Sequence, residues 1–597
     1  MGMGTGRVSG QGGHWNMTGA GNNTVRAASA GFLFIGCVTA LLCLLALPFT
    51  AAIGPFYWDT LIYYDATARI ASGQIPIIDF LAPVGPSGYW LFYALHEVFP
   101  DGQGVYLATW SILLVSAPAM VPVLCDAARK SGLVAVALAV PFLVFSALPF
   151  NVEQFYPYPG VDGYGIYNRH ISQLLYVVVA ALLFADSAIA RVISLTMALT
   201  ALFLTKITGF VIALPLVLLA LFARRLRLRE LVAVTALFVS VLVGLEIWCG
   251  LTSAYVESIA ELVSMNEGAL LIEIVHAGAT HIAILTALGL LLLMLFWLER
   301  DDLGEAWDDF IAGRKAAAIC TVARSTWMWL LAVTIGGLML ESQNWGGQAF
   351  LFIWPVLLRA ALVDRSAWPA RGSAFVTILI AAAALPTLAN IGGRAIRTYA
   401  AQMQYDVVEI EELGPLSAVS KRDKIDKRVA LIREQSIRNP DYFRSYAAAG
   451  ELPRFTYYAN PEFQLAWLAA IGEGVAAIRH YEARNDMRFE TILSLNFVNP
   501  FPYLLDRDSA RHVTIGKDPF RTLPPTDAQA RAEIADTDLV LWPKCPVTVA
   551  NVRIRDAYGA HLDDRLTIPL SPCWDGLVRP ELAPDDLASE NGTTNGA

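Results

Sequence analysis

The stretch "YWDTLIYYDATARIASGQIPIIDFLAPVGPSGYW", residues 57–90, directly follows the first long apolar run of the chain. It contains three aspartates, one arginine and a Pro-Val-Gly-Pro turn. We expect a short helix here, with Asp59 as its N-cap and Gly73 as the glycine after its end. A second apolar helix of about fourteen residues is expected over 86–99, and both are too short to cross a hydrocarbon core about 30 Å thick. The stretch therefore predicts a platform of two helices lying at the membrane surface.

The side chains of this platform include both aromatic and acidic groups. Aromatic residues of this kind form belts at the level of the lipid headgroups, and they are Tyr57, Trp58, Tyr63, Tyr64, Tyr89, Trp90 and Tyr93. Asp59 and Asp79 stand at the bends, where a carboxylate beside a low-dielectric cavity could serve as a general base. A helix cap and a hydrogen-bond acceptor for its own loop are the structural alternatives for these two. Asp65 and Arg69 lie four residues apart, which indicates an intrahelical ion pair.

The whole chain has the composition of a polytopic α-helical membrane protein. It has 597 residues, of which 56% are hydrophobic and 16% charged, and its mean hydropathy is +0.50. These values exclude an ordinary soluble enzyme. The net charge of −9 gives no reason to expect nucleic acid as a partner.

About eleven transmembrane helices are expected, each in one of the long apolar stretches. These lie near residues 31–53, 105–124, 132–150, 171–187, 192–205, 207–223, 231–250, 281–298, 326–340, 348–363 and 374–391. The Lys and Arg residues of the short loops then fall on one side, which predicts a cytoplasmic N-terminus. The Ala-, Val- and Arg-rich composition and the domain arrangement favour a bacterial source, and hence a multi-pass protein of the inner membrane. Residues 1–30 lack the features of a cleaved signal peptide and are expected to be disordered.

Four parts of the chain follow from this topology. After the disordered cytoplasmic residues 1–30 comes a transmembrane domain, 31–391, with an external loop over 54–104. A periplasmic domain is expected over 392–585, and 586–597 form a disordered tail.

The periplasmic domain alternates between two patterns. Helix-like stretches at 461–483 and 526–536 precede the β-rich runs "ETILSLNF" (490–497) and "TDLVLWP" (537–543), which favours a soluble α/β domain. Cys545 and Cys573 are its only cysteines. In an oxidising compartment they are candidates for a disulfide, and two unpaired buried thiols are the alternative.

The order of features in the first loop resembles that of GT-C superfamily glycosyltransferases. An acidic residue follows the first span, a helix ends in "ASGQIP", and "IIDF" and "PVGPSGYW" come next. The relatives use dolichyl- or polyprenyl-phosphate sugars and include protein mannosyltransferases and the lipid A aminoarabinose transferase. The resemblance covers roughly 31–391 and implies that Asp59 is the catalytic acidic residue and Asp79 a second acidic position. Thr60 follows Asp59 where relatives carry a second acid, so a divalent metal is possible but has no paired carboxylates to support it, and no cofactor is expected with certainty.

Two cations are candidates for holding the donor phosphate. Lys206, in "LTKITGF", falls at a break between two spans, and Arg169, in "GIYNRHIS", opens a span from the outside. A lysine serves as a point charge and an arginine as a bidentate clamp. As alternatives, Lys206 could snorkel to the interface, and Arg169 could pair with Asp162 or Glu153 of its own loop.

Further candidates for a substrate pocket are Tyr64, His170, Gln343 and Asn344, of which the last two belong to a short polar link that could equally be a solvated turn. Glu273, His276 and His281 have a loosely ligand-like spacing, but the zinc signal is weak without a fourth partner.

Together these features predict a membrane glycosyltransferase that uses a polyprenyl-phosphate sugar on the external face. Its expected partners are that donor, membrane lipids and an envelope glycan, glycolipid or protein acceptor. Two other function classes stay open: a transporter or flippase for lipid-linked glycans, and a non-catalytic envelope-assembly protein. A transporter is expected to show repeats and ionisable residues deep in several spans, and the sequence has no evident repeat.

Overall fold

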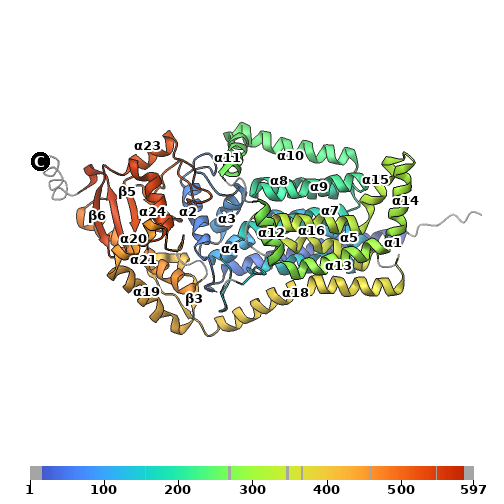
Figure 1. Ribbon diagram of the computed structural model, residues 1–597, viewed down its shortest axis with the longest axis horizontal. Helices are drawn as coiled ribbons and strands as arrows, with labels where there is room; N and C mark the ends of the chain where they lie inside the picture. Colours follow the sequence, from blue (N-terminus) through green and yellow to red (C-terminus); the bar gives the residue numbers. More distant parts are fainter. Residues whose placement is uncertain are drawn as a thin grey trace, which may run out of the picture.

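The computed structural model describes residues 17–154, 156–265, 270–343, 348–364, 368–455, 460–545 and 547–583. The chain forms an elongated molecule, with a bundle of helices at one end and a sheet covered by helices at the other (Figure 1). Helix α1 already begins at Met17, so the expectation of disorder up to residue 30 is wrong for residues 17–30. Residues 1–16 and the expected tail at 586–597 lie outside the described part.

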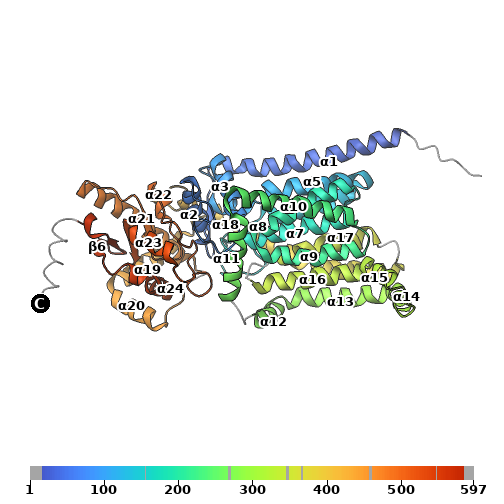
Figure 2. The same ribbon diagram turned by 90° about the horizontal axis from the view of Figure 1, so that it is seen from above.

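The bundle is built from long helices that run side by side along the long axis (Figures 1 and 2). Its helices, with the shorter ones that connect them, are α1 (Met17–Cys43), α4 (Gly104–Trp110), α5 (Leu113–Lys130), α6 (Gly132–Ala147), α7 (Ile166–Phe184), α8 (Ala188–Thr205), α9 (Ile207–Phe222), α10 (Leu228–Cys249), α11 (Leu251–Met265), α12 (Leu270–Thr280), α13 (Ile282–Leu298), α14 (Arg300–Ile311), α15 (Lys315–Arg324), α16 (Thr326–Gln343), α17 (Trp354–Leu362) and α18 (Ala370–Gln402).

The protein is an integral membrane protein by the length and composition of these helices. In the described part of the chain, six helices are long and apolar enough to cross a membrane. The number is eight if each of two strongly bent helix pairs counts as one span. Three shorter apolar helices accompany them, at Gly132–Ala147, Ile207–Phe222 and Phe350–Leu362. Each of the eleven expected stretches contains one of these helices, and the number that truly cross stays a prediction. Helix α18 runs on to Gln402 rather than ending near residue 391.

The C-terminal region contains a four-stranded sheet of order β4-β5-β7-β6. Strands β4 (Ile492–Ser494) and β5 (Leu539–Pro543) are parallel, and β7 (Trp574–Val578) runs antiparallel to both β5 and β6 (Leu566–Ser571). The helices of this region are α19 (Asp426–Arg438), α20 (Pro440–Ala449), α21 (Pro461–Asn485), α22 (Phe501–Leu505), α23 (Ala528–Asp536) and α24 (Val549–Tyr558). Cys545 and Cys573 form a disulfide, with their Cα atoms 4.9 Å apart.

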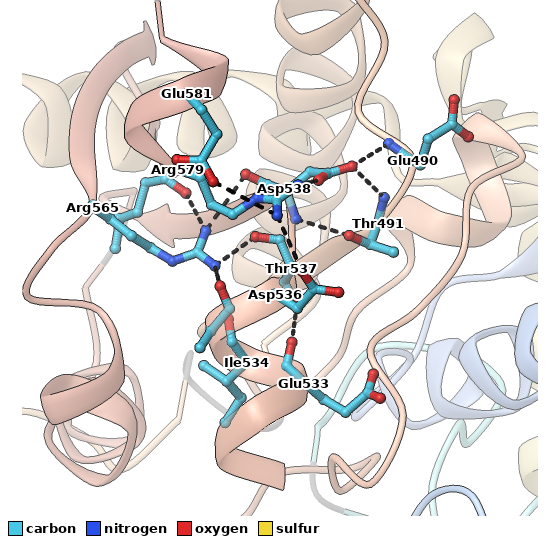
Figure 3. A network of polar contacts seen from close by, with 12 residues as sticks. Glu490, Thr491, Glu533, Ile534, Asp536, Thr537, Asp538, Arg565, Arg579 and Glu581 are labelled. Carbon is cyan, nitrogen blue, oxygen red and sulfur yellow. Dashed lines mark hydrogen bonds and ion pairs between the residues drawn. The ribbon is translucent and has the colours of Figure 1, made fainter. Parts of the chain in front are cut away.

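A polar network lies at the end of the sheet where helix α23 leads into strand β5 (Figure 3). The guanidinium of Arg565 donates to the carbonyl oxygens of Ile534 and Ala535, at 2.8 and 3.0 Å. These are carbonyls at the end of a helix, which have no partner inside the helix itself. Asp538 accepts from the backbone N–H of Glu490 and Thr491 at 2.7 and 3.2 Å, so the same network sets the pairing of β4 with β5.

The first loop is enclosed between the two ends of the molecule. Its helices α2 (Asp59–Ala71) and α3 (Ser87–Val98) lie at the boundary between bundle and sheet in both views (Figures 1 and 2). Strand β1 (Ala51–Ala52) pairs in parallel with β3 (Val419–Lys421), which in turn pairs antiparallel with β2 (Asp406–Val407). The backbone N–H groups of His512 and Ile515 donate to the carbonyl oxygens of Asp79 and Leu81.

This enclosure corrects the expectation of an open interfacial platform. Nine of the residues of α2 are buried, because the C-terminal region covers the face that was expected to meet water and lipid headgroups. Asp59 is the first residue of α2 rather than its cap, a position held by Trp58, whereas Gly73 has the expected positive φ of 84°. The expected ion pair of Arg69 with Asp65 is present at 2.9 Å and is fully buried.

Candidate functional site

The Pro-Val-Gly-Pro turn of the first loop rests directly on the break between α8 and α9. The N–H of Gly85 donates to the carbonyl oxygen of Thr205 at 2.9 Å, and the hydroxyls of Ser87 and Thr205 lie 2.7 Å apart. A Cβ atom on Gly85 would lie 2.2 Å from the carbonyl oxygen of Leu204. Only glycine permits the turn to come this close to the backbone of α8. The first loop and the break at Lys206 therefore form one structural unit.

Lys206 occupies this break with its side chain half-buried. Its ammonium donates to Asn168 Oδ1 at 3.2 Å and lies 5.0 Å from the centre of the Tyr167 ring. The charges of Arg521 and Glu341 are within electrostatic range of it. Arg521 comes from the C-terminal region, so two cations from distant parts of the sequence approach one another here.

Asp59 is the first residue of α2, and its side chain is half-buried. The indole N–H of Trp58 donates a hydrogen bond to its carboxylate, and burial raises the pKa of Asp59 to about 7. Burial penalises the charged form because little water remains to solvate it. A carboxyl with a pKa near neutrality is well matched to accepting a proton at physiological pH.

Three tyrosines connect Asp59 with Lys206. Asp59 interacts electrostatically with Tyr63 and Tyr89, and both of these interact with Tyr167, on whose ring Lys206 lies. Burial raises the pKa of the Tyr63 and Tyr89 hydroxyls, which keeps both neutral. The acid and the lysine thus flank one aromatic wall.

Arg169 does not join this wall as an available cation. It is fully buried, and its guanidinium donates to Asn151 Oδ1 at 3.0 Å and to the carbonyl oxygen of Tyr164 at 2.9 Å. Longer contacts reach Thr109 and the carbonyl oxygen of Asp162. These bonds hold the external loop 151–165 through neutral acceptors, whereas the carboxylate of Asp162, one of the two ion-pair partners considered for Arg169, pairs with Arg394 instead.

Asp79 is likewise engaged in holding its loop. Its carboxylate accepts from the N–H of Ile75 at 2.7 Å and pairs with Arg511 at 3.3 Å. The contact joins the first loop to the C-terminal region, and this geometry fits the structural alternative better than catalysis.

Tyr64 and His170 lie in the core rather than at the wall. The Tyr64 ring packs against Phe92 and Tyr503, at 5.3 and 4.8 Å between centroids. His170 is fully buried, and its Nε2 lies 2.9 Å from the carbonyl oxygen of Ala108.

The polar link after α16 is only partly described. Gln343 is the last residue of α16 and is half-buried, and Asn344 lies outside the described residues. The same end of α16 borders a cavity of about 200 Å³ lined by Glu153, Glu273, His276, Ala277, Thr280, His281 and Glu341. His281 Nε2 lies 3.2 Å from Glu341 Oε2 and 3.9 Å from Glu153 Oε1. Among the residues that the structure covers, no group of three or more His, Cys, Asp or Glu has an arrangement that could hold a metal ion.

The sequence interpretation did not include Arg521, Tyr63, Tyr89 or Tyr167 in the site. The tyrosines were assigned to a headgroup belt or not singled out. Arg521 lies in the segment "GKDPFRTLPP" (516–525), more than three hundred residues after Lys206, and no pattern in that segment links it to the lysine.

Among known proteins, the chain shows a likeness only to solved structures. No protein-family model and no curated protein matches the chain. Two solved structures resemble it along nearly their whole length: ArnT from Cupriavidus metallidurans in the apo state, with 14% identity, a TM-score of 0.39 and coverage of 94% of this chain and 99% of that one, and the same protein bound to undecaprenyl phosphate, with 14% identity, a TM-score of 0.37 and coverage of 92% and 97%. ArnT is of the class that the first loop resembles, and a likeness at this identity and TM-score carries no argument about residues or activity.

Proposed function

We propose that this protein is an integral-membrane glycosyltransferase of the GT-C type. It transfers a sugar from a polyprenyl-phosphate donor to a hydroxyl of a cell-envelope acceptor, at the external face of a bacterial inner membrane. The observation that carries the proposal is the wall of Tyr63, Tyr89 and Tyr167, with a carboxyl of pKa about 7 at one end and Lys206 at the other.

The reaction needs two chemical functions. The bond from the anomeric carbon to the phosphate oxygen breaks, and a bond to the acceptor oxygen forms. The acceptor hydroxyl loses a proton, which Asp59 accepts as general base. The phosphate gains negative charge as it leaves, and fixed cations stabilise this charge in the transition state.

Lys206 and Arg521 supply the positive charge in this proposal. Like charges held near one another are unfavourable, and an anion placed between them removes the penalty. The donor phosphate is such an anion, and Glu341, within electrostatic range of Lys206, offsets part of the positive charge. Arg521 takes the role that the sequence assigned to Arg169, because both terminal nitrogens of that buried guanidinium already donate hydrogen bonds within the protein.

The remaining assignments follow the same topology. Asp59 is the catalytic base, and Asp79 acts by positioning the first loop through Arg511. The C-terminal region is periplasmic and covers the site from outside.

The test is turnover of a radiolabelled polyprenyl-phosphate sugar by the full-length protein in nanodiscs. Asp59→Asn should lose about 10²–10⁴-fold in rate, the usual contribution of a general base, while still binding donor. Asp79→Asn is the matched control, and it should keep most of the activity. Equal losses in the two variants, or an unchanged rate in Asp59→Asn, would remove Asp59 from the mechanism.

A further inference from the structure

A second group of aromatic rings adjoins Asp59 through Trp58. It consists of Phe56 and Trp58 from the first loop and Phe455, Phe497 and Phe520 from the C-terminal region, and is called the aromatic platform below. The Trp58 ring lies 6.1, 6.2 and 6.3 Å from Phe56, Phe455 and Phe497. Phe455 lies 5.1 Å from Phe497 and 6.2 Å from Phe520.

The platform is more open than the other aromatic groups near the site. Tyr63, Tyr64 and Tyr89 are each at most 5% exposed, as expected of core residues. In contrast, all four phenylalanines of the platform keep part of their surface exposed, and only Trp58 is buried. A partly open set of rings beside a candidate catalytic carboxyl is a surface suited to binding.

Charged groups border the open rings. The guanidinium of Arg454 lies over the Phe520 ring at 4.7 Å, and both Arg454 and Arg521 are exposed. Asp518 lies within electrostatic range of both arginines. Hydrogen-bonding groups at the rim thus surround apolar ring faces, an arrangement that suits a ligand with hydroxyls at its edge and C–H groups on its face.

The platform is continuous with the proposed base, because the indole N–H of Trp58 donates to Asp59. In the proposed function the donor phosphate is held at Lys206, between two membrane helices. The platform residues come from the first loop and from the C-terminal region. What it binds must therefore present a hydroxyl to Asp59 from outside the bundle.

We propose that the aromatic platform binds a saccharide of the acceptor, an inference that rests on the proposed function. The C–H face of a pyranose ring stacks on Phe497 and Phe520, while its hydroxyls bond to Arg454 and Asp518, and Arg521 stays with the donor phosphate. The hydroxyl nearest Trp58 then reaches Asp59, which takes its proton as the new glycosidic bond forms. The acceptor is thereby a glycan or the sugar headgroup of a glycolipid rather than a peptide or an acyl chain.

Saturation-transfer NMR on the full-length protein in nanodiscs tests this inference. The probes are maltotetraose, cellotetraose and mannotetraose, with a tetra-alanine peptide as the comparison. At least one tetrasaccharide should receive saturation on its ring C–H protons. Phe520→Ala should weaken that affinity about fivefold, since one aromatic contact contributes roughly 0.5–1.5 kcal/mol. Phe520→Trp should keep it.

A matched control lies in the same region. Tyr442 of α20 is 54% exposed, packs against Tyr446 at 4.5 Å between ring centroids and is not one of the platform rings. Tyr442→Ala should leave tetrasaccharide binding unchanged. The inference is overturned if no tetrasaccharide is saturated, if Phe520→Ala binds as the unchanged protein does, or if the peptide alone responds. Asp59→Asn should still bind the tetrasaccharide; if it also keeps full transfer activity, the proposed base fails while the platform stands.

Discussion

Two groups of positively charged side chains in this protein differ in the partners that accept their hydrogen bonds. Around the external loop 151–165, Arg394 pairs with Asp162 at 2.7 Å, and Arg169 donates to Asn151 and to backbone carbonyl oxygens. At the α8–α9 break, Lys206 has an amide oxygen and an aromatic ring as neighbours and a second cation within electrostatic range. The first group is a completed structural anchor, and the second is suited to receive an anion.

The comparison shows that a buried arginine and a half-buried lysine with similar sequence settings have different kinds of hydrogen-bond partner. Both follow polar motifs at the ends of spans, and the sequence offers both as phosphate ligands. Their partners separate them: carbonyl oxygens, an amide oxygen and a carboxylate accept hydrogen bonds from the guanidinium groups, whereas the ammonium has few charged partners. The following predictions test this division.

The largest expected effect is on the anchor. Asp162→Asn removes the carboxylate that pairs with the buried guanidinium of Arg394, so the free energy of unfolding should fall by about 3–5 kcal/mol. Thermal unfolding of the detergent-solubilised protein measures it. Asp186→Asn, which breaks an exposed ion pair with Lys130, is the control and should change stability by less than about 1 kcal/mol. Similar stability of the two variants would mean that loop 151–165 is not anchored in this way.

A smaller effect, on donor affinity rather than on stability, is expected at Lys206 between α8 and α9. Lys206→Gln removes the cation that contacts the donor phosphate, so donor affinity should fall by about 10–100-fold, the usual contribution of a charge-assisted hydrogen bond. Stability should change little, because no carboxylate loses a direct partner. Isothermal titration with a short-chain polyprenyl phosphate gives the affinity. Unchanged affinity would indicate that Lys206 only snorkels to the interface.

The smallest effect is expected for the second cation. Arg521 is exposed, so water and salt screen its interaction with the phosphate. Arg521→Gln should weaken donor binding by no more than about fivefold, and the difference from the unchanged protein should shrink as salt is raised. A loss as large as that of Lys206→Gln, independent of salt, would mean that the arginine contacts the phosphate directly.

The sequence predicts the elements better than their surroundings. Apolar stretches of membrane length and the two interface-length helices of the first loop were identified because periodicity and length are local properties. The burial of α2 was missed because it depends on a covering region more than four hundred residues away, through bonds such as that of His512 to Asp79. A helix with Asp, Thr and Arg side chains has the same pattern whether it faces water or pairs internally, as Arg69 does with Asp65.

In the candidate site, too, local features could be predicted from the sequence and contacts between distant segments could not. Asp59 and Lys206 could be proposed from the sequence because an acidic residue after the first span and a lysine between two spans are unusual by themselves. The hydrogen bonds of Arg169, most of them to residues of the external loop 151–165, could not be found from the sequence. Its role as a phosphate ligand stays a prediction. Arg521 could not be found, because an arginine in a polar segment has no distinguishing feature until the fold brings it near Lys206.

The most direct test of the central claim is the pH dependence of kcat/KM for sugar transfer, since this quantity reports the pKa of the essential base in the free enzyme. Asp59 must be deprotonated to accept a proton, so activity should be lost as pH falls through about 7, the pKa that burial confers on its carboxyl. In Asp59→Asn the residual activity should lose this transition. A profile that is flat between about pH 5 and pH 8, or one whose transition persists in Asp59→Asn, would contradict the assignment of Asp59 as the general base.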